Sequence, residues 1–495
     1  MTARRRGERG RRPVSVAVIG SGVCGIAAAV KLRAAGIRDV TIYDKADGIG
    51  GTWWSNTYPG CGVDVPSYAY SFTFHPYDWS RSHASQDEVQ RYLEDVIDTF
   101  DLRSALRLST EITSVTWEAD AAEYVLVDAD GGEHRHTVVV ASVGLLSVPN
   151  WPDWPGLESF AGPVFHTSQW DHSQDLAGRR VAFVGTGSTG AQVVPALAGV
   201  ASHLDVYQRE PGWILPRQDR VYTAAERRRH HGSGLRRRAS RVQYFVRYRR
   251  AVQALDVDSA QQQRQRAAGL DFIRSQIADP DVRAAVTPDY PFGCKRTIYS
   301  DTFYAALDRP DVDLHPTAVT RVTPSGVVAA DGLERAADVL VVGTGFRPAE
   351  PLSTIAIAGS DGQKLQDAWG DTKGTFLGMT VPGFPNLFMT FGPNTNAGSI
   401  MALAEWQAGV IARTVRRLQR SDAAAVEATE GARDRYTAWI DRRLARFTKA
   451  QESGCHNYYH SASGRNVTQW PGNPGVYWAA SRLLPRIGLR LRGKG

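Results

Sequence analysis

The chain has 495 residues, of which 42% are hydrophobic and 22% charged, and its formal net charge is +7. This length and composition are typical of a globular protein with two or three domains and exclude a fibrous or intrinsically disordered chain. No apolar run approaches the roughly 18 residues of a membrane span. The four cysteines are far apart and form no CxxC pair, which excludes a dithiol redox centre and fits a cytoplasmic protein.

Two glycine-rich segments each follow a short apolar run. Residues 20–25 read GSGVCG after the run 14–19, and residues 185–190 read GTGSTG after the run 181–184. In such a strand-to-helix turn the first glycine makes the tight turn, the second lets the backbone approach a pyrophosphate, and the third lets the helix pack on the sheet. We therefore predict an α/β fold with two Rossmann-like dinucleotide-binding domains. The contacts predicted in the loops are Gly20, Gly22, Gly25, Gly185, Thr186, Gly187, Ser188, Thr189 and Gly190.

The residue that ends the second strand of each unit differs in charge. Asp44 follows the run 40–43, and Arg209 follows 203–208 at the same distance from its own glycine loop. A carboxylate accepts hydrogen bonds from a ribose diol and repels a 2′-phosphate, whereas a guanidinium binds that phosphate through a contact worth about 1.5 to 3 kcal/mol. The first loop is therefore predicted to bind FAD and the second NADPH. The alternative for either loop is a strand-to-helix turn without a ligand.

Shifts in composition divide the chain into segments that return to each unit. Four prolines between residues 149 and 163 indicate an extended connection, and the polar, strand-poor stretch 218–292 interrupts the second unit. The apolar run 338–342 is interpreted as the return to the first domain. The predicted organisation is a disordered basic tail (1–12), an FAD-binding domain (13–150 and 336–495), an NADP-binding domain (151–217 and 293–335) and a helical insertion (218–292).

Positive charge is concentrated in one stretch of the predicted insertion. Residues 220–250 contain eleven arginines and a single acid, Glu226. Such a patch could recognise nucleic acid, an anionic substrate or an acidic carrier protein. A run of like charge is more often one solvated helical face. We favour the solvated face and expect no nucleic-acid and no membrane partner, with an acidic carrier protein as the alternative.

The segment between the two loops carries the most specific pattern. Residues 160–171 read FAGPVFHTSQWD, which fits the form FxGxxxHxxxWD. Here the sequence resembles the type I Baeyer-Villiger monooxygenases, a class B flavoprotein monooxygenase family. The resemblance covers nearly the whole chain and includes the segments 50–54 (GGTWW), 58–60 (YPG), 293–296 (GCKR), 392–394 (GPN), 464–466 (GRN) and 470–472 (WPG).

This resemblance implies an NADPH- and O2-dependent flavin monooxygenase. Such an enzyme inserts one oxygen next to a ketone carbonyl and gives an ester or lactone through a peroxyflavin and a tetrahedral intermediate. Arg296 matches the family's catalytic arginine, and Asp64 matches the carboxylate that holds it in place. A fixed cation suits this chemistry because negative charge develops on the peroxide and then on the former carbonyl oxygen. The alternative for Arg296 is a contact with the NADP phosphate alone.

The resemblance also implies individual cofactor contacts. Lys295 matches a second contact with the 2′-phosphate, and Tyr458 stands where the family has the aromatic residue that meets NADP and substrate. Glu210 departs from the pattern, because a small hydroxyl residue is common there and a negative charge opposes phosphate binding. The other predicted contacts are Gly51, Thr52, Trp53, Trp54, Ser55, Asp64, Tyr70 and Ile112 for FAD, and Gln192 after the second loop; Trp53 and Trp54 have core packing as their alternative.

Two other functions stay open on the same scaffold: an N- or S-oxygenase, against which Trp170, Asp171 and Arg296 argue, and a non-oxygenating NADPH flavoprotein. His166 is interpreted as orienting one domain against the other rather than as a general base. The expected partners are a small-molecule ketone and O2, with the chain a monomer or a weak homo-oligomer, in secondary metabolism. The resemblance places the insertion near the active site.

Overall fold

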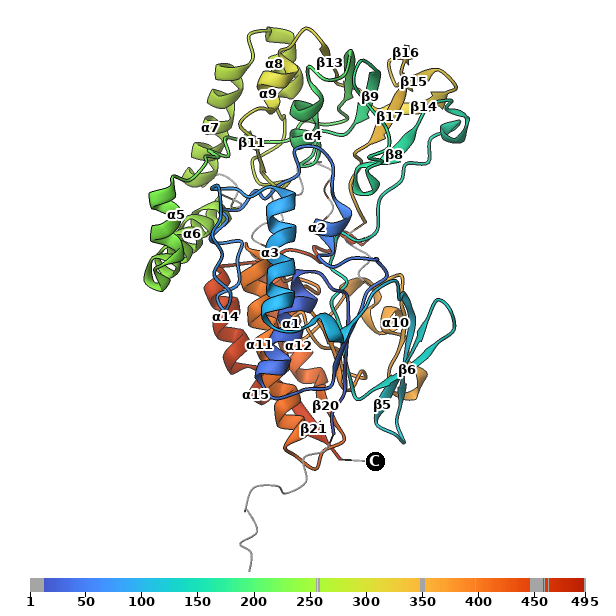
Figure 1. Cartoon of the computed structure of the whole chain (residues 1–495), viewed down its shortest axis with the longest axis vertical. Coiled ribbons are helices and arrows are strands. Elements are labelled where there is room, and N and C mark those ends of the chain that lie inside the picture. Colours follow the sequence, from blue (N-terminus) through green and yellow to red (C-terminus); the bar gives the residue numbers. More distant parts are fainter. Residues whose placement is uncertain are drawn as a thin grey trace, which may run out of the picture.

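The computed structural model describes residues 13–254, 256, 259–347, 352–396, 398–445, 457, 459–461 and 463–493. The predicted tail, residues 1–12, and the predicted contact Tyr458 lie outside this part of the chain. The described residues form two halves, the lower and the upper in Figure 1, each built on a five-stranded parallel sheet. Within these ranges, no helix has the length and apolar character needed to cross a membrane.

The lower sheet begins with the apolar run that precedes the first glycine loop. β1 (Val16–Ile19) pairs in parallel with β2 (Val40–Tyr43) and β7 (Val138–Ala141), and the order is β19-β7-β1-β2-β3. Every residue of β1 is buried, because α1 covers one face and a four-stranded sheet covers the other. This explains why the strand has a continuous apolar sequence rather than an alternating one.

The remaining elements of the lower half surround this sheet. The edge strands are β3 (Leu106–Arg107) and β19 (Leu387–Met389). The covering sheet consists of β4 (Ile112–Glu118), β5 (Glu123–Asp128), β6 (Glu133–His136) and β18 (Ala356–Ala358). The helices and the last strand pair are α1 (Val23–Ala34), α2 (Thr52–Ser55), α3 (Gln86–Thr99), α10 (Leu365–Trp369), α11 (Ile400–Gln419), α12 (Glu430–Leu444), α14 (Pro474–Leu483), α15 (Pro485–Gly488), β20 (Ala425–Ala428) and β21 (Leu489–Arg492).

The upper sheet repeats the same arrangement around the second glycine loop. Its order is β13-β10-β9-β17-β8, and α4 (Gly190–Leu197) follows the loop as α1 does in the lower half. The strands are β8 (Val164–His166), β9 (Arg180–Val184), β10 (His203–Tyr207), β13 (Val312–His315) and β17 (Val339–Val342). A small antiparallel sheet of β14 (Val319–Thr323), β15 (Gly326–Ala329) and β16 (Glu334–Ala336) and the helix α9 (Phe303–Leu307) complete it. The two predicted dinucleotide units are thus both present as parallel sheets.

Strand β17 differs from the sequence interpretation, which gives residues 336–342 to the first domain. It lies between β9 and β8 and pairs in parallel with both, so it belongs to the upper sheet. An all-apolar strand followed by glycines suits the buried centre of either parallel sheet. The local pattern therefore could not say which of the two sheets it completes.

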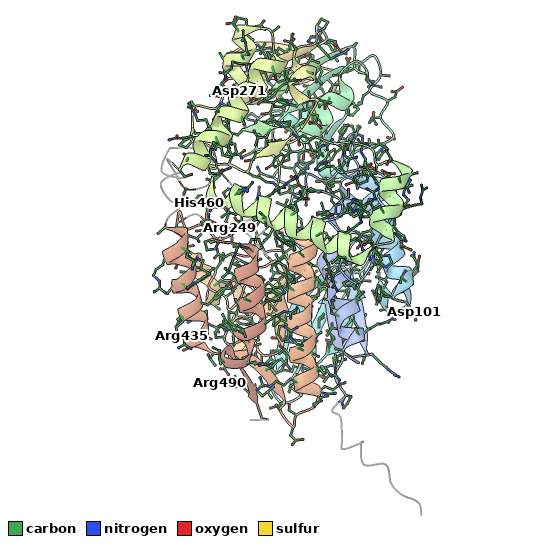
Figure 2. All side chains as sticks on the ribbon, turned by 90° about the vertical axis from the view of Figure 1, so that its left-hand side faces the viewer. Asp101, Arg249, Asp271, Arg435, His460 and Arg490 are labelled. Atoms are coloured by element: carbon green, nitrogen blue, oxygen red, sulfur yellow. The ribbon has the colours of Figure 1, made fainter. Side chains whose placement is uncertain are left out.

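The polar stretch 218–292 is helical, as predicted. It contains α5 (Ala224–His231), α6 (Gly234–Gln253), α7 (Ala260–Gln276) and α8 (Pro280–Val286). In Figure 2 the green α6 lies across the ends of the orange and red C-terminal helices, and its Phe245 ring stacks on Trp406 of α11 at 5.7 Å. α7 packs instead on β11 (Ile214–Leu215), which pairs with β12 (Ile298–Tyr299). The insertion therefore contacts both halves.

Candidate active site

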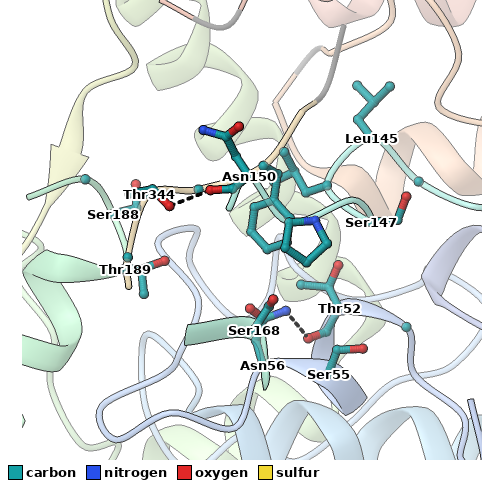
Figure 3. Close-up of a pocket in the computed structure, with 18 of the residues that line it drawn as sticks. Thr52, Ser55, Asn56, Leu145, Ser147, Asn150, Ser168, Ser188, Thr189 and Thr344 are labelled. Atoms are coloured by element: carbon teal, nitrogen blue, oxygen red, sulfur yellow. Dashed lines mark hydrogen bonds between the residues drawn. The ribbon is translucent and has the colours of Figure 1, made fainter. Parts of the chain in front are cut away.

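One cavity of about 1320 Å³ lies between the two halves, at the carboxyl ends of β1 and β9. Open α/β sheets bind their ligands at this edge. Figure 3 shows Thr52 and Ser55 of α2 and Ser188 and Thr189 of the second loop around the same space. A pocket for one small ligand is typically about 300 to 1,000 Å³, so this cavity has room for more than one.

The structure brings most of the predicted contacts to this cavity. Those that line it are Gly20, Gly22, Asp44, Gly51, Thr52, Trp53, Ser55, Asp64, Tyr70, Ile112, Gly185, Thr186, Gly187, Ser188, Thr189, Gln192, Arg209, Lys295 and Arg296. Gly25, Gly190 and Trp54 are described but do not line it. Residues from eight separate stretches of the sequence therefore converge on one site.

The two glycines that lie outside the lining have a packing role. A Cβ at Gly25 would lie 1.8 Å from the carbonyl oxygen of Gly20, and a Cβ at Gly190 would lie 2.2 Å from that of Gly185. Each position must be glycine for the helix to approach its own loop. Gly187 is different, because a Cβ there would meet no atom within 4 Å. Its open face borders the cavity, where a ligand can approach the backbone.

Trp54 points away from the site that the resemblance assigns to it. Its side chain is exposed, and its Nε1 donates a hydrogen bond to Asp47 Oδ1 at 3.1 Å. The neighbouring Trp53 is buried, lines the cavity and donates from Nε1 to the Tyr70 hydroxyl at 2.9 Å. Successive residues of a helix face different directions, so the short α2 can direct only one of the two indoles inward.

Asp44 closes the first loop at the end of β2. Its Oδ2 accepts hydrogen bonds from both the backbone N and the Oγ of Ser21, each at 2.6 Å, and its Oδ1 accepts one from Ala46 N at 2.9 Å. These hydrogen bonds hold the Asp44 carboxylate in the lining of the cavity. The charge is negative at the position where a ribose diol is expected to donate its hydrogen bonds.

The positive charge at the second loop is divided between two residues with different surroundings. Arg209 lines the cavity, is exposed and forms no ion pair with any described carboxylate. Lys295 forms an ion pair with Glu210 and also lies over the Tyr290 ring at 4.8 Å. Glu210, the residue that departs from the family pattern, therefore directs its charge at Lys295. Arg209 is thus exposed beside the cavity, and no described carboxylate pairs with it.

Arg296 and Asp64 form an ion pair across the cavity. Asp64 comes from the lower half and Arg296 from the segment before β12 in the upper half. The Asp64 side chain is 21% exposed and the Arg296 side chain 46% exposed, so solvent reaches the guanidinium. The predicted pairing of these two residues is thus present.

Three tyrosines that the sequence interpretation does not identify lie near Arg296. Tyr244 and Tyr248 come from α6, and Tyr299 from β12. Burial raises the pKa of each hydroxyl; the nearby Arg296 acts in the opposite direction in all three, and a hydrogen bond with the Gly398 backbone does so at Tyr248. All three stay neutral at physiological pH. Tyr244 and Tyr248 lie four residues apart in the insertion, which is about one helical turn. This spacing was the available signal, but the surrounding arginines obscured it.

His166 lies where two segments that connect the halves pass each other, one containing Trp151 and the other Phe346. Its Nδ1 accepts a hydrogen bond from Ser168 N at 3.2 Å and pairs with Ser168 Oγ at 2.8 Å. Its ring contacts Trp151 and Phe346, one from each connection. The two connections also bond to each other, through Asn150 N to Gly345 O at 2.8 Å and Thr344 Oγ1 to Asn150 O at 2.6 Å (Figure 3). Burial lowers the pKa of His166, so the ring is neutral at physiological pH.

Comparisons with known proteins agree over most of the chain. A family model described as pyridine nucleotide-disulphide oxidoreductase matches residues 17–229. A Baeyer-Villiger monooxygenase of Streptomyces coelicolor is 38% identical over 485 residues, which cover 95% of this chain and 91% of that protein. A solved structure of an oxidized steroid monooxygenase bound to NADP superposes with a TM-score of 0.88 at 28% identity and covers 97% of this chain and 100% of its own. An ε-caprolactone-bound cyclohexanone monooxygenase superposes with a TM-score of 0.86 at 28% identity and covers 97% and 99%.

The two parallel sheets, each with its glycine loop at one shared cavity, define an oxidoreductase with two dinucleotide-binding domains. Within that class, the match to the Streptomyces coelicolor protein over 95% of this chain identifies the family. The chain belongs to the Baeyer-Villiger monooxygenase family.

Proposed function

We infer that this protein is an NADPH- and O2-dependent flavin monooxygenase that converts a small ketone into an ester or lactone. The observation that carries this inference is the single cavity that joins both glycine loops to the ion pair of Arg296 and Asp64. The proposed reaction begins at one nucleotide and ends at an intermediate that carries negative charge. It therefore needs both nucleotide loops and the ion pair close together in one cavity.

The residues present fit the two nucleotides. The open face of Gly187 and the exposed Arg209 suit the pyrophosphate and the 2′-phosphate of NADPH, and Asp44 suits the ribose of FAD. When bound, FAD reduced by NADPH supplies the chemistry that activates O2.

Arg296 is the residue that we assign to stabilising the reaction. Its guanidinium is charged at any relevant pH and stabilises negative charge on the former carbonyl oxygen of the ketone. Asp64 holds that guanidinium toward the cavity. Because the two residues come from different halves, the position of Arg296 depends on how the halves meet. Tyr244, Tyr248 and Tyr299 lie close enough to Arg296 for its charge to oppose the effect of burial on the pKa of their hydroxyls.

Replacement of Arg296 tests this assignment. Arg296→Ala should retain flavin absorbance, because the predicted FAD contacts lie in the lower half, and should lose ester formation by about 10²- to 10³-fold, as expected when a charge-stabilising group is removed. The measurement is product mass from a panel of ketones with NADPH. Arg321→Ala, an exposed arginine of β14, is the matched control and should behave as wild type. Ester formation at the normal rate in Arg296→Ala would refute the role.

The same panel separates the alternative functions. An N-oxide, hydroxylamine or sulfoxide without ketone turnover would indicate the N- or S-oxygenase, and oxidation of NADPH without any organic product would indicate the non-oxygenating flavoprotein. A cytoplasmic location, a monomeric or weakly oligomeric state and an acidic carrier partner stay predictions.

A further inference from the structure

A row of titratable side chains lies on one face of the upper sheet, along β10 and the edge strand β13. Residues two apart on a strand share a face, so His203 and Asp205 of β10 point the same way. Asp205 is in register with Asp313, which places Asp313 and His315 of β13 on that face too. Two carboxylates directly opposite each other on neighbouring strands repel unless a cation lies between them.

The distances within this row are those of a chelating site. His203 Nε2 is 3.6 Å from Asp205 Oδ1 and 3.2 Å from Asp313 Oδ2. One ligand atom from each of the three residues lies within 4.8 Å of the other two. Tetrahedral ligands with metal bonds of about 2.0 to 2.2 Å are separated from one another by about 3.4 Å. The three side chains are therefore already close to the spacing that a bound ion would require.

Asp205 supplies independent support. It is 3% exposed, and its Oδ2 is buried without a hydrogen-bond partner among the described residues. An unpartnered buried carboxylate oxygen is costly, and a bound cation is one of the few ways to satisfy it. The other oxygen, Oδ1, is 2.7 Å from His315 Nε2. Oδ1 is also the oxygen that lies 3.6 Å from His203 Nε2, so His315 holds the carboxylate in place beside His203.

We propose that His203, Asp205 and Asp313 bind a divalent transition-metal ion such as Zn²⁺ and that His315 positions Asp205. One imidazole nitrogen with two carboxylate oxygens suits first-row transition metals, whereas Mg²⁺ and Ca²⁺ prefer all-oxygen ligands. Two carboxylates also balance the charge of a divalent ion. The Asp313 side chain is 61% exposed and the His203 side chain 24% exposed, so an ion can enter from solvent and keep water as a fourth ligand.

The consequence concerns stability rather than turnover. β13 is an edge strand, and a metal shared between Asp313 and β10 would cross-link it to the sheet. An ion that binds the folded state and not the unfolded chain stabilises the fold in proportion to its saturation. The site holds none of the residues assigned to the reaction.

Zinc titration of the tag-free holoprotein, after treatment with EDTA, tests the proposal. Calorimetry should show one saturable site for Zn²⁺, at least tenfold weaker binding of Mg²⁺, and a rise in the melting temperature with Zn²⁺. Loss of an outer-shell partner alone costs 10- to 100-fold in metal affinity, so His203→Gln and Asp313→Asn should each weaken Zn²⁺ binding by roughly 100-fold or more. His231→Gln, an exposed histidine of α5, is the matched control and should bind as wild type.

Two results would overturn the proposal: no saturable Zn²⁺ binding by the wild type, or binding unchanged in both variants. Asp313→Asn should not disturb folding, because the Asp313 side chain is exposed. The melting temperature of each variant in EDTA checks that the metal-free fold is intact. Anomalous diffraction at the zinc edge should place the ion between β10 and β13; a peak elsewhere would equally refute the assignment.

Discussion

Coenzyme preference is expected to depend on Arg209, which follows β10, and on Lys295 with its partner Glu210. Arg209 lines the cavity and pairs with no carboxylate in the described part of the chain, whereas Lys295 pairs with Glu210. Both cations are predicted to contact the 2′-phosphate, so Glu210 competes with the phosphate for one of them. A partly exposed ion pair of this kind is worth up to about 1 kcal/mol.

Glu210→Ser should therefore improve the use of NADPH. Releasing Lys295 is expected to lower the KM for NADPH by about fivefold, the equivalent of about 1 kcal/mol. The KM for NADH should not change, since NADH has no 2′-phosphate. Initial-rate kinetics with both coenzymes measure this. An equal change for the two coenzymes would show that Glu210 acts on something other than the phosphate contact.

His166 should make stability depend on pH. Its pKa in the folded protein is lowered by burial below the ordinary 6.5, so the unfolded chain binds a proton that the folded chain does not. The free energy of unfolding should fall as pH falls below 6.5, with a slope approaching about 1.4 kcal/mol per pH unit from this residue, until the folded pKa is reached. His166→Gln cannot titrate and should flatten that part of the curve. Denaturant unfolding between pH 5 and pH 7.5 measures the slope, and an identical curve for the variant would contradict the assignment.

At the scale of the elements, two glycines of the second loop have different roles, one in ligand binding and the other in folding. Gly187 leaves space before the helix α4, whereas Gly190 touches the carbonyl of its own loop. The two positions belong to one motif, and a methyl group added at each should have different effects.

Gly187→Ala should fold, keep its flavin and lose about tenfold in NADPH affinity, about 1.4 kcal/mol, because the new methyl group occupies the space where the pyrophosphate approaches. Gly190→Ala should instead lower the melting temperature, since its Cβ meets the carbonyl oxygen of Gly185. Flavin absorbance, NADPH titration and thermal melting distinguish the two. Normal NADPH affinity in Gly187→Ala would show that the ligand does not approach this loop.

The sequence predicted some elements well because their constraints are local. Both glycine loops, the strands before them and the residues Asp44 and Arg209 follow from short-range geometry. Strand β17 did not, because a buried apolar strand fits either sheet and only long-range pairing decides between them. For a related reason, Trp54 was predicted as a cofactor contact although it points away from the cavity, and Tyr244 and Tyr248 were not identified. The direction of a side chain depends on which neighbour its helix packs against, and the sequence around them does not encode that neighbour locally.

At the scale of the whole molecule, the two halves share one apolar core cluster and are also joined by polar contacts. The Tyr58 hydroxyl donates to Gln192 Oε1 at 3.0 Å, and Gln192 Nε2 donates to Gly62 O at 3.0 Å. The crossing connections at His166 and the ion pair of Asp64 with Arg296 join the halves at two further places. The cavity, and with it the position of Arg296, is therefore a property of the assembled halves rather than of either sheet.

In the proposed reaction, one oxygen atom from O2 is transferred to a ketone in this cavity. The most direct test is turnover of a ketone with NADPH under ¹⁸O2, followed by mass spectrometry of the product. An ester or lactone that carries one ¹⁸O atom per molecule, formed in step with NADPH oxidation, is the predicted result. Consumption of NADPH that yields only hydrogen peroxide, or an oxidised nitrogen or sulfur compound with every ketone left unchanged, would contradict it.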